Sequence, residues 1–473
     1  MVVETQVPVD VLVRGGPVVT MNEARQVHDP GYVAVKDGRV VAVGDARDCN
    51  YAATRRIDVP SHAIMPGLIN CHTHLTNGLY RGLYDELPLA DWLEQGLWPV
   101  LRAATAESRY AGAALSIAEN LLGGVTTVVV GEFGGKNSGS IDGVLRAVRE
   151  SGIRAIVSRV AVDSADDTDP SQATPLDLRE NIAAVLQDVD RLRDQFNSPL
   201  LSVVPEPLGV LRCTPDMIQA MSEYARNTGC RMTMHVSSSE HEINESIRRY
   251  GRSPIAQLDA LGALGDYLSI AHCVWPTEHD IERLASTGTG VSHNPVANLM
   301  YAVGVAPLVE MIDAGVRVGL GTDGSSTNNG QNLWETMKMA IFLQKQRKGA
   351  RWGSGELALE LATIGGASVI SSESTLGSIE VGKRADLISV EMNGPSAVPR
   401  HTWPSNLVYA QGISGVRYVL VDGKVVVDDG RLTAWDLDDV LGRANEGAAY
   451  IEDATGLASK FRARSRWTWP TSD

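Results

Sequence analysis

The stretch Met65-Pro-Gly-Leu-Ile-Asn-Cys-His-Thr-His-Leu75 predicts a buried β-strand that ends in two histidines. Residues two apart on an extended strand project from the same face, so His72 and His74 can bind one metal ion together. The pair is also compatible with two unrelated histidines, one of which simply satisfies a hydrogen bond. Ligands elsewhere in the chain have to decide between these interpretations.

The chain beyond this stretch alternates strand-like runs with helix-length amphipathic segments. Eight such β–α pairs over about 310 residues are typical of an α/β fold, the parallel (β/α)8 TIM barrel. An open doubly wound sheet is the alternative, but its first strand would precede a glycine-rich phosphate-binding turn, where this chain has His-Thr-His. The expected strands are 63–69, 126–130, 154–160, 200–204, 231–235, 268–272, 288–293 and 316–321.

Both ends of the chain are rich in short alternating strands. Asp-Gly pairs at 37–38 and 422–423 separate apolar runs, which is a strong hairpin signal. We therefore expect a small discontinuous β-sandwich that both termini build around the barrel. The expected domains are the sandwich at 1–62 and 377–440, the (β/α)8 barrel at 63–376, and a C-terminal helix and tail at 441–473.

Composition excludes several classes of partner. The net charge of −15 repels phosphate backbones, so we expect no nucleic acid. No stretch approaches the ~18 apolar residues of a membrane helix, and the N-terminus does not look like a signal peptide. The five cysteines are scattered and odd in number, which fits a reducing cytoplasm. We expect a cytoplasmic homo-oligomer of two or more subunits that acts on a small molecule.

Ligand-type side chains gather at the expected strand ends. The carboxyl ends of barrel strands converge on one mouth, where catalysis takes place in this fold. Five of the ten histidines and one aspartate lie there. Each alone could be a cap or a satisfied polar group, but together they indicate a metal site. They follow strands one, five, six, seven and eight: His72, His74, His235, His272, His293 and Asp323.

Nearly the whole chain resembles the amidohydrolase superfamily. The resemblance runs from the N-terminal strands through the His-Thr-His stretch to Gly382-Lys-Arg-Ala-Asp386. It is most similar to the branch that holds triazine hydrolases, adenosine- and guanine-type aminohydrolases, and hydrolases of phenylurea and thiocarbamate (molinate) herbicides. The segments 292–298 and 321–329 look typical of that branch. The resemblance implies a metal-dependent hydrolase whose ligands are His72, His74, His235 and Asp323, with His272 as a fifth ligand or a partner of the bound water.

The resemblance also bears on the number and kind of metal ions. Binuclear members usually bridge their ions with a carboxylated lysine at the end of strand four, and 202–208 contains no lysine. We therefore expect one divalent ion per subunit. Imidazole and carboxylate ligands suit zinc, which we expect here, and also iron(II) or cobalt(II).

The catalytic roles follow from the metal. A bound ion lowers the pKa of its water toward neutrality and supplies a hydroxide nucleophile. Asp323 can accept the water's proton and pass it to the leaving group. His272 or His293 can stabilise the negative charge that develops in the transition state. A turn within the Gly- and Asn-rich loop is the structural alternative for Asp323, but the resemblance favours catalysis.

Two departures from the branch concern the substrate. Aminohydrolases usually have a glutamate three residues after the strand-five histidine, which protonates a ring nitrogen; here that residue is Ser238. Glu240 could compensate only if the loop is rearranged. Glu206 replaces a substrate-contacting histidine that is common in aminohydrolases. The missing acid weakens a deaminase hypothesis, whereas a carbonyl substrate needs no such protonation.

We therefore expect hydrolysis of an amide, urea or thiocarbamate C–N bond in a small, fairly apolar molecule, including xenobiotics such as herbicides. The alternative is an aminohydrolase (deaminase) or a dechlorinating triazine-type hydrolase that acts on a heteroaromatic ring. A non-catalytic binding protein is disfavoured because the ligand set is complete. Aromatic loop residues can equally be packing, but in a pocket they favour an apolar or aromatic substrate. The expected substrate-binding residues are Trp92, Trp98, Glu206, Ser238 and Tyr301.

Overall fold

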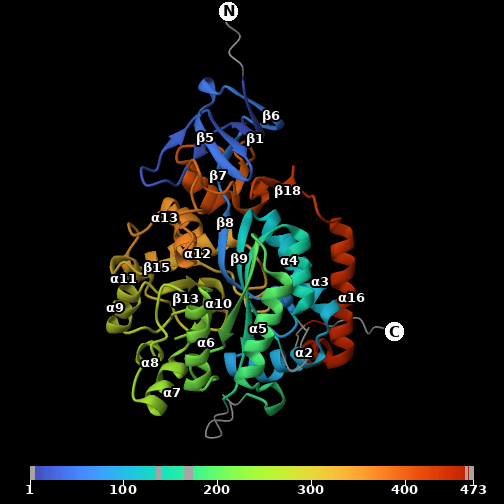
Figure 1. The fold of residues 1–473 in the computed structure, drawn as a ribbon, viewed down its shortest axis with the longest axis vertical. Helices are drawn as coiled ribbons and strands as arrows, with labels where there is room; N and C mark the ends of the chain where they lie inside the picture. The colour runs from blue at the N-terminus through green and yellow to red at the C-terminus, as the bar shows by residue number, and fades with distance from the viewer. Residues whose placement is uncertain (1–5, 135–140, 165–173, 464–466, 468–473) are drawn as a thin grey trace, which may run out of the picture.

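The computed structural model describes residues 6–134, 141–164, 174–463 and 467. A barrel forms the body of the molecule, and a β-rich unit built from both ends of the chain lies against one end of it (Figure 1). Two four-stranded parallel sheets make the barrel, in the orders β8-β9-β10-β11 and β12-β13-β14-β15. This arrangement confirms the predicted (β/α)8 fold.

The barrel closes where its two sheets meet. β11 lies beside β12, and β15 lies beside β8. At the second seam the Asp323 N–H donates to the His72 carbonyl at 2.9 Å. The strands are β8 (Leu68–Thr73), β9 (Val125–Phe133), β10 (Arg154–Ala161), β11 (Leu201–Pro207), β12 (Met232–Val236), β13 (Leu268–His272), β14 (Gly290–His293) and β15 (Arg317–Leu320).

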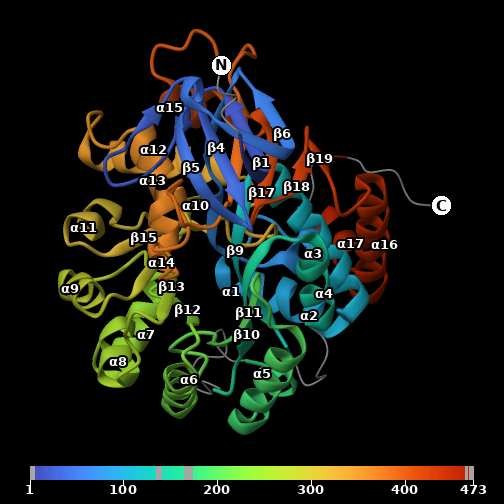
Figure 2. The same ribbon diagram turned by 45° about the horizontal axis from the view of Figure 1, so that its top comes forward.

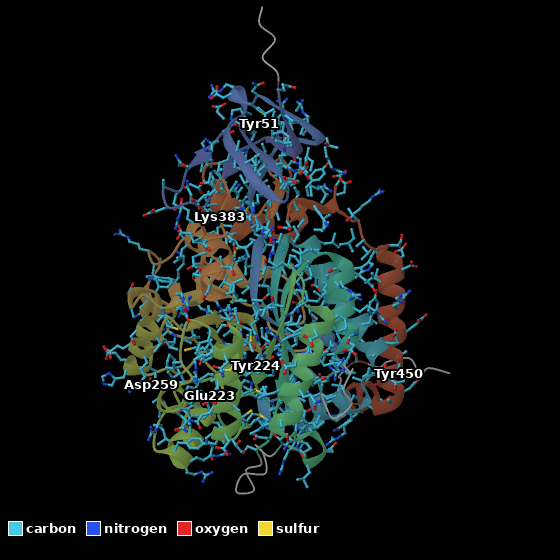
Figure 3. All side chains as sticks on the ribbon, viewed as in Figure 1. Tyr51, Glu223, Tyr224, Asp259, Lys383 and Tyr450 are labelled. Carbon is cyan, nitrogen blue, oxygen red and sulfur yellow. The ribbon has the colours of Figure 1, made fainter. Side chains whose placement is uncertain are left out.

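Helices surround the barrel on its outside (Figure 2). α6 shows how they are delimited: the Thr214 hydroxyl accepts a hydrogen bond from Met217 N, and Gly229 ends the helix with a left-handed φ of 63°. Charged side chains such as Glu223 and Asp259 lie on the outer surface (Figure 3). Within the described residues, no helix combines the length and apolar character needed to cross a bilayer.

The helices fall into an outer layer and shorter segments in the loops. The outer layer comprises α3 (Ala106–Leu122), α4 (Asp142–Ser151), α5 (Ile182–Phe196), α6 (Pro215–Thr228), α7 (Glu240–Tyr250), α8 (Pro254–Ala260), α9 (Glu278–Thr287), α11 (Leu308–Asp313), α12 (Leu333–Lys348) and α13 (Gly355–Glu360). The shorter helices are α1 (Leu89–Trp92), α2 (Trp98–Ala103), α10 (Pro295–Met300), α14 (Gly366–Val369) and α15 (Trp403–Ser405).

The β-rich unit contains two sheets with an apolar layer between them. Val33 and Ile57 from one sheet pack with Leu387 from the other. The first sheet has the order β5-β4-β1-β6 and the second β19-β18-β17-β16-β7-β2-β3. Their strands are β1 (Val7–Gly15), β2 (Val18–Val19), β3 (Val27–His28), β4 (Gly31–Lys36), β5 (Arg39–Asp45), β6 (Tyr51–Val59), β7 (His62–Pro66), β16 (Leu387–Glu391), β17 (Val416–Val421), β18 (Lys424–Asp428) and β19 (Arg431–Leu432).

Most strand ends differ from the expected ones by one to three residues, and two larger differences change how an element is assigned. The predicted strand 63–69 is divided: β7 pairs with β16 in the sandwich, whereas β8 opens the barrel. The chain passes from the sandwich into the barrel at Gly67. A larger residue would not fit there, because its Cβ would lie 2.1 Å from the Thr126 hydroxyl oxygen. The C-terminal helix α16 (Leu437–Thr455) begins before residue 441, since the Asp436 side chain caps it. It packs along α3 and is followed by α17 (Leu457–Arg462) (Figure 1).

Candidate metal centre and active site

Four histidines and one aspartate meet at the carboxyl end of the barrel. Asp323 Oδ1 lies 3.4 Å from His74 Nε2 and 3.6 Å from His72 Nε2. His235 Nε2 lies 3.3 Å from His74 Nε2. His272 Nε2 lies 3.9 Å from Asp323 Oδ2. The structure thus brings together five residues that are spread along the chain from position 72 to position 323.

The nitrogen atoms of this cluster are arranged for a cation. His74 Nδ1 lies 2.6 Å from the Gly131 carbonyl oxygen, and His235 Nδ1 lies 3.1 Å from Glu206 Oε1. Each acceptor favours a proton on Nδ1 and leaves a lone pair on Nε2. Two such lone pairs at 3.3 Å cannot hydrogen-bond to each other. His72 Nε2 is also buried without a hydrogen-bond partner among the described residues. The donor set therefore fits a divalent metal ion.

The protonation states suit metal binding. Burial lowers the pKa of His72 to about 3 and that of His272 to about 4. Burial opposes ionisation of Asp323, but the neighbouring histidines outweigh it and hold the pKa of its carboxyl well below the usual range. Neutral imidazoles and an ionised carboxylate are the forms that bind a metal ion.

Strained backbone accompanies this cluster. A left-handed conformation costs a non-glycine residue about 1–2 kcal/mol, and such residues persist where the surroundings hold them. The Asp323 carbonyl, for example, accepts hydrogen bonds from Thr73 Oγ1 and Gln331 Nε2, both at 3.1 Å. The left-handed residues at this mouth are Ser237 (φ 55°), His272 (φ 75°), Cys273 (φ 47°) and Asp323 (φ 62°).

Glu206 lies behind a metal-ligand candidate. Its side chain is 1% exposed and faces His235 Nδ1, while Thr233 Oγ1 donates to Oε2 at 2.6 Å. Burial opposes ionisation, but His235 and Thr233 outweigh it and lower the pKa of Glu206 to about 2. The sequence predicted a substrate contact for Glu206. The structure places Glu206 off the described pocket wall and beside His235, a position from which a carboxylate can orient a ligating imidazole.

A cavity of about 430 Å³ opens at the metal-ligand cluster. Its wall is mainly apolar and includes Trp92 and Tyr301, whose rings pack edge to face with centroids 5.7 Å apart. Ser238, His272 and Asp323 also lie on the wall. The volume falls within the range of pockets that bind small organic molecules, roughly 300–1,000 Å³.

Trp98 and His293 also lie away from the described pocket wall. Trp98 is buried and packs edge to face against Phe133, with ring centroids 5.9 Å apart. His293 is fully buried, and neither ring nitrogen has a hydrogen-bond partner within the described part of the chain. Both residues come from elements that support the mouth, but neither side chain reaches the cavity.

Sequence reasoning missed two acidic residues of the pocket wall, Glu132 and Glu242. Glu240, the proposed substitute for the missing acid, is exposed and lies off the described wall. Glu242 lies on the wall and accepts hydrogen bonds from Ser237 N at 3.0 Å and Ser238 N at 2.7 Å. The run Ser239-Glu-His-Glu242 was the available signal, because S-x-x-E at a helix start turns the glutamate back toward the preceding residues.

A (β/α)8 barrel with a histidine–aspartate metal site at its mouth defines a class of metal-dependent hydrolases. Within that class, the model of the Amidohydrolase family matches residues 63–426. The chain therefore belongs to the amidohydrolase family. It is a hydrolase that acts on C–N bonds other than peptide bonds.

Several known proteins are similar to this chain in sequence and structure over almost its full length. A 5-methylthioadenosine/S-adenosylhomocysteine deaminase of Syntrophobacter fumaroxidans is 34% identical over 94% of this chain and 98% of its own length. An adenosine deaminase of Xanthomonas campestris with bound zinc superposes with a TM-score of 0.88 and 30% identity, covering 95% of this chain and all of that one. The zinc complex of an atrazine chlorohydrolase of Arthrobacter aurescens TC1 gives 0.86 and 27%, with 93% and 100% covered.

Proposed function

We propose that this enzyme is an aminohydrolase that removes the exocyclic amino group of an adenosine-type heteroaromatic substrate as ammonia. The observation that carries the proposal is the similarity over nearly the whole chain to proteins named as adenosine-type deaminases. The pocket supports it as well, because the rings of Trp92 and Tyr301 offer apolar faces to a planar substrate. This proposal reverses the order of the two functions expected from the sequence.

We also propose that the metal is zinc, one ion per subunit, which two similar structures contain. His72, His74, His235 and Asp323 would hold the ion, with His272 beside them. When bound, zinc lowers the pKa of a water molecule so that a nucleophile is available near neutral pH. The Asp323 carboxylate then accepts a proton from the attacking water and returns it to the departing amino group.

The second candidate function is hydrolysis of a substrate with a carbonyl or thiocarbamate carbon. Ser238 supports hydrolysis of an amide, urea or thiocarbamate, because a carbonyl carbon needs no ring protonation to become electrophilic. The apolar wall, with Leu93, Leu101 and Phe133, would accept such small molecules too.

One substrate panel separates the two functions. The protein loaded with zinc, iron(II) or cobalt(II) is offered adenosine-type nucleosides, aminotriazines, chlorotriazines, anilides, phenylureas and thiocarbamates. We expect ammonia from the nucleosides, measured by a coupled assay, and none from the Asp323→Asn variant. Turnover confined to anilides, ureas or thiocarbamates would overturn the deaminase proposal and favour the second candidate.

A further inference from the structure

The Glu242 carboxyl group, in the first turn of α7, lies on the wall of the cavity. We propose that Glu242, acting through the Ser238 hydroxyl, donates the proton to the ring nitrogen of the substrate. The acid that is missing at position 238 would thus be supplied from four residues further along the chain. The inference rests on the proposed deaminase function and adds the residue that activates the ring.

The contacts of Glu242 fix its carboxylate in one place. Oε1 accepts from Ser237 N at 3.0 Å and Oε2 from Ser238 N at 2.7 Å. The Ser238 side chain also favours the ionised form of this carboxylate and so opposes part of the rise in its pKa. Ser239 caps α7 by accepting from Glu242 N at 3.2 Å. The two backbone donors stabilise the ionised form, which is the form that remains once the proton has been transferred.

The other carboxylates on the described pocket wall have different tasks. Asp323 belongs to the metal-ligand cluster. Glu132 accepts from Thr76 N at 2.9 Å and from the Thr76 hydroxyl at 2.8 Å, and Arg109 Nη1 lies 3.7 Å from it. Glu132 is therefore paired with the buried Arg109 guanidinium. Glu242 is the wall carboxylate that can carry a proton to the substrate.

The surroundings of Glu242 favour a protonated group. Burial raises the pKa of Glu242, and the backbone donors and the charge of His235 only partly oppose this rise. The titratable groups that act on it are His235 at the end of β12 and Cys273 after β13. Arg212 and His241 lie on the same wall. A carboxyl with a raised pKa holds its proton closer to neutral pH, as a general acid must.

The proton transfers balance over one turnover. As the attacking water forms the C–O bond to the ring carbon, its proton goes to Asp323. The Glu242 proton moves to Ser238 Oγ while the Ser238 hydroxyl gives its own proton to the ring nitrogen. Asp323 then protonates the departing amino group, the C–N bond breaks and ammonia leaves. The proton of the new hydroxyl returns through solvent to Glu242 as the carbonyl forms, and the ring nitrogen keeps its proton in the product.

Four variants test the assignment by steady-state kinetics on an adenosine-type nucleoside. Glu242→Gln should lower kcat by at least about 100-fold, because general acids contribute about 10²–10⁴-fold, while KM stays nearly unchanged. Ser238→Ala should lower kcat in the same direction because the relay is broken. The matched control Glu240→Gln changes an exposed residue of the same helix turn and should behave as wild type. Ser238→Glu combined with Glu242→Gln should recover part of the lost kcat.

Two further measurements separate catalysis from helix capping. The wild-type rate should fall at alkaline pH as Glu242 loses its proton, and this limb should disappear in Glu242→Gln. A nucleoside analogue with a tetrahedral carbinol carbon and an adjacent ring N–H should bind the wild type about tenfold more tightly than Glu242→Gln, since one hydrogen bond is lost. Calorimetry measures this affinity without turnover. Metal content and melting temperature of each variant show that it is folded and loaded.

The two proposals fail in different ways. A metal-loaded wild type that releases no ammonia from any amino heterocycle overturns the deaminase function and the assignment that rests on it. A wild type that does release ammonia, with Glu242→Gln retaining its kcat, its alkaline limb and its affinity for the analogue, overturns only the role of Glu242. Glu242 would then be a helix-capping residue whose loss lowers the melting temperature alone.

Discussion

At the carboxyl end of the barrel, His72 Nε2 and Asn298 Nδ2 are buried without partners among the described residues. At the amino end, the partly buried Arg154 guanidinium donates to the buried Asp386 carboxylate at 3.0 and 2.9 Å, and Asp422 N donates to the same carboxylate at 2.8 Å. An unpaired buried polar group costs about 1–3 kcal/mol, so proteins rarely keep one without a reason. The Arg154–Asp386 pair at the amino end is thus satisfied by the fold itself, whereas the mouth holds groups ready for a metal ion and a substrate.

Left-handed backbone occurs at both ends, since Asp422 at the amino end has a φ of 50°, but it gathers around the metal-ligand candidates. Non-glycine residues with left-handed φ lie at the ends of strands at the mouth, as at Asp323 (φ 62°) and His272 (φ 75°). The amino end instead joins two units: Arg154 begins β10, and Asp386 precedes β16 of the sandwich. In barrels of this class the mouth carries the chemistry and the opposite end carries stability. Three substitutions test whether that division holds here.

The largest effect is expected at the mouth. Asp323→Asn removes both a metal ligand and the group that transfers the proton, so kcat should fall by about 10²–10⁴-fold from the proton transfer alone. Steady-state assays and metal analysis measure the two losses. Asp313→Asn, an exposed aspartate at the end of α11, is the matched control and should keep full activity. An Asp323→Asn enzyme with unchanged kcat would contradict the site.

The next largest effect is expected at the amino end, and on stability. Arg154→Met leaves the Asp386 carboxylate buried and unpaired, which should lower the free energy of unfolding by about 3–5 kcal/mol. Activity per folded molecule should not change. Arg102→Met breaks an exposed ion pair with Asp177 and should cost less than about 1 kcal/mol. Urea unfolding compares the two. Loss of activity in folded Arg154→Met would contradict the assignment of stability to the amino end and of chemistry to the mouth.

A smaller effect is expected just behind the mouth. Glu206→Gln weakens the interaction that orients His235, so metal affinity should fall by about 10–100-fold. Chelator competition measures this affinity, and Glu223→Gln on the outside of α6 is the control. If Glu206 contacted the substrate instead, KM would rise while metal affinity stayed constant.

Much of the architecture could be predicted because it repeats locally. The alternation of strands and helices identified the barrel, and the rule that strand ends converge placed His72, His235 and Asp323 together. The crossing at Gly67 could not be predicted, since one continuous apolar run supplies both β7 and the beginning of β8. Only pairing with β16 assigns the first half to the sandwich.

The side-chain roles around the metal show the limit of the sequence. Glu206 and Glu240 were the acids that a comparison of positions suggested, yet one lies behind His235 and the other is exposed. Glu242 reaches the pocket because the helix start at Ser239 turns its carboxylate back toward Ser237 and Ser238. Trp98 and His293 looked equivalent to other site residues, but packing keeps both away from the described wall.

Residue types and a periodicity that every strand repeats were enough to predict the fold class, the family and the metal-ligand candidates. Only the packing of distant segments places Glu242 on the pocket wall and Glu206 behind His235. A side chain's role depends on the direction of its Cα–Cβ bond and on what covers it, and both are set by segments distant in the chain. His72 and His74 could be read from a single strand; Glu242 required the turn, the helix and the pocket together.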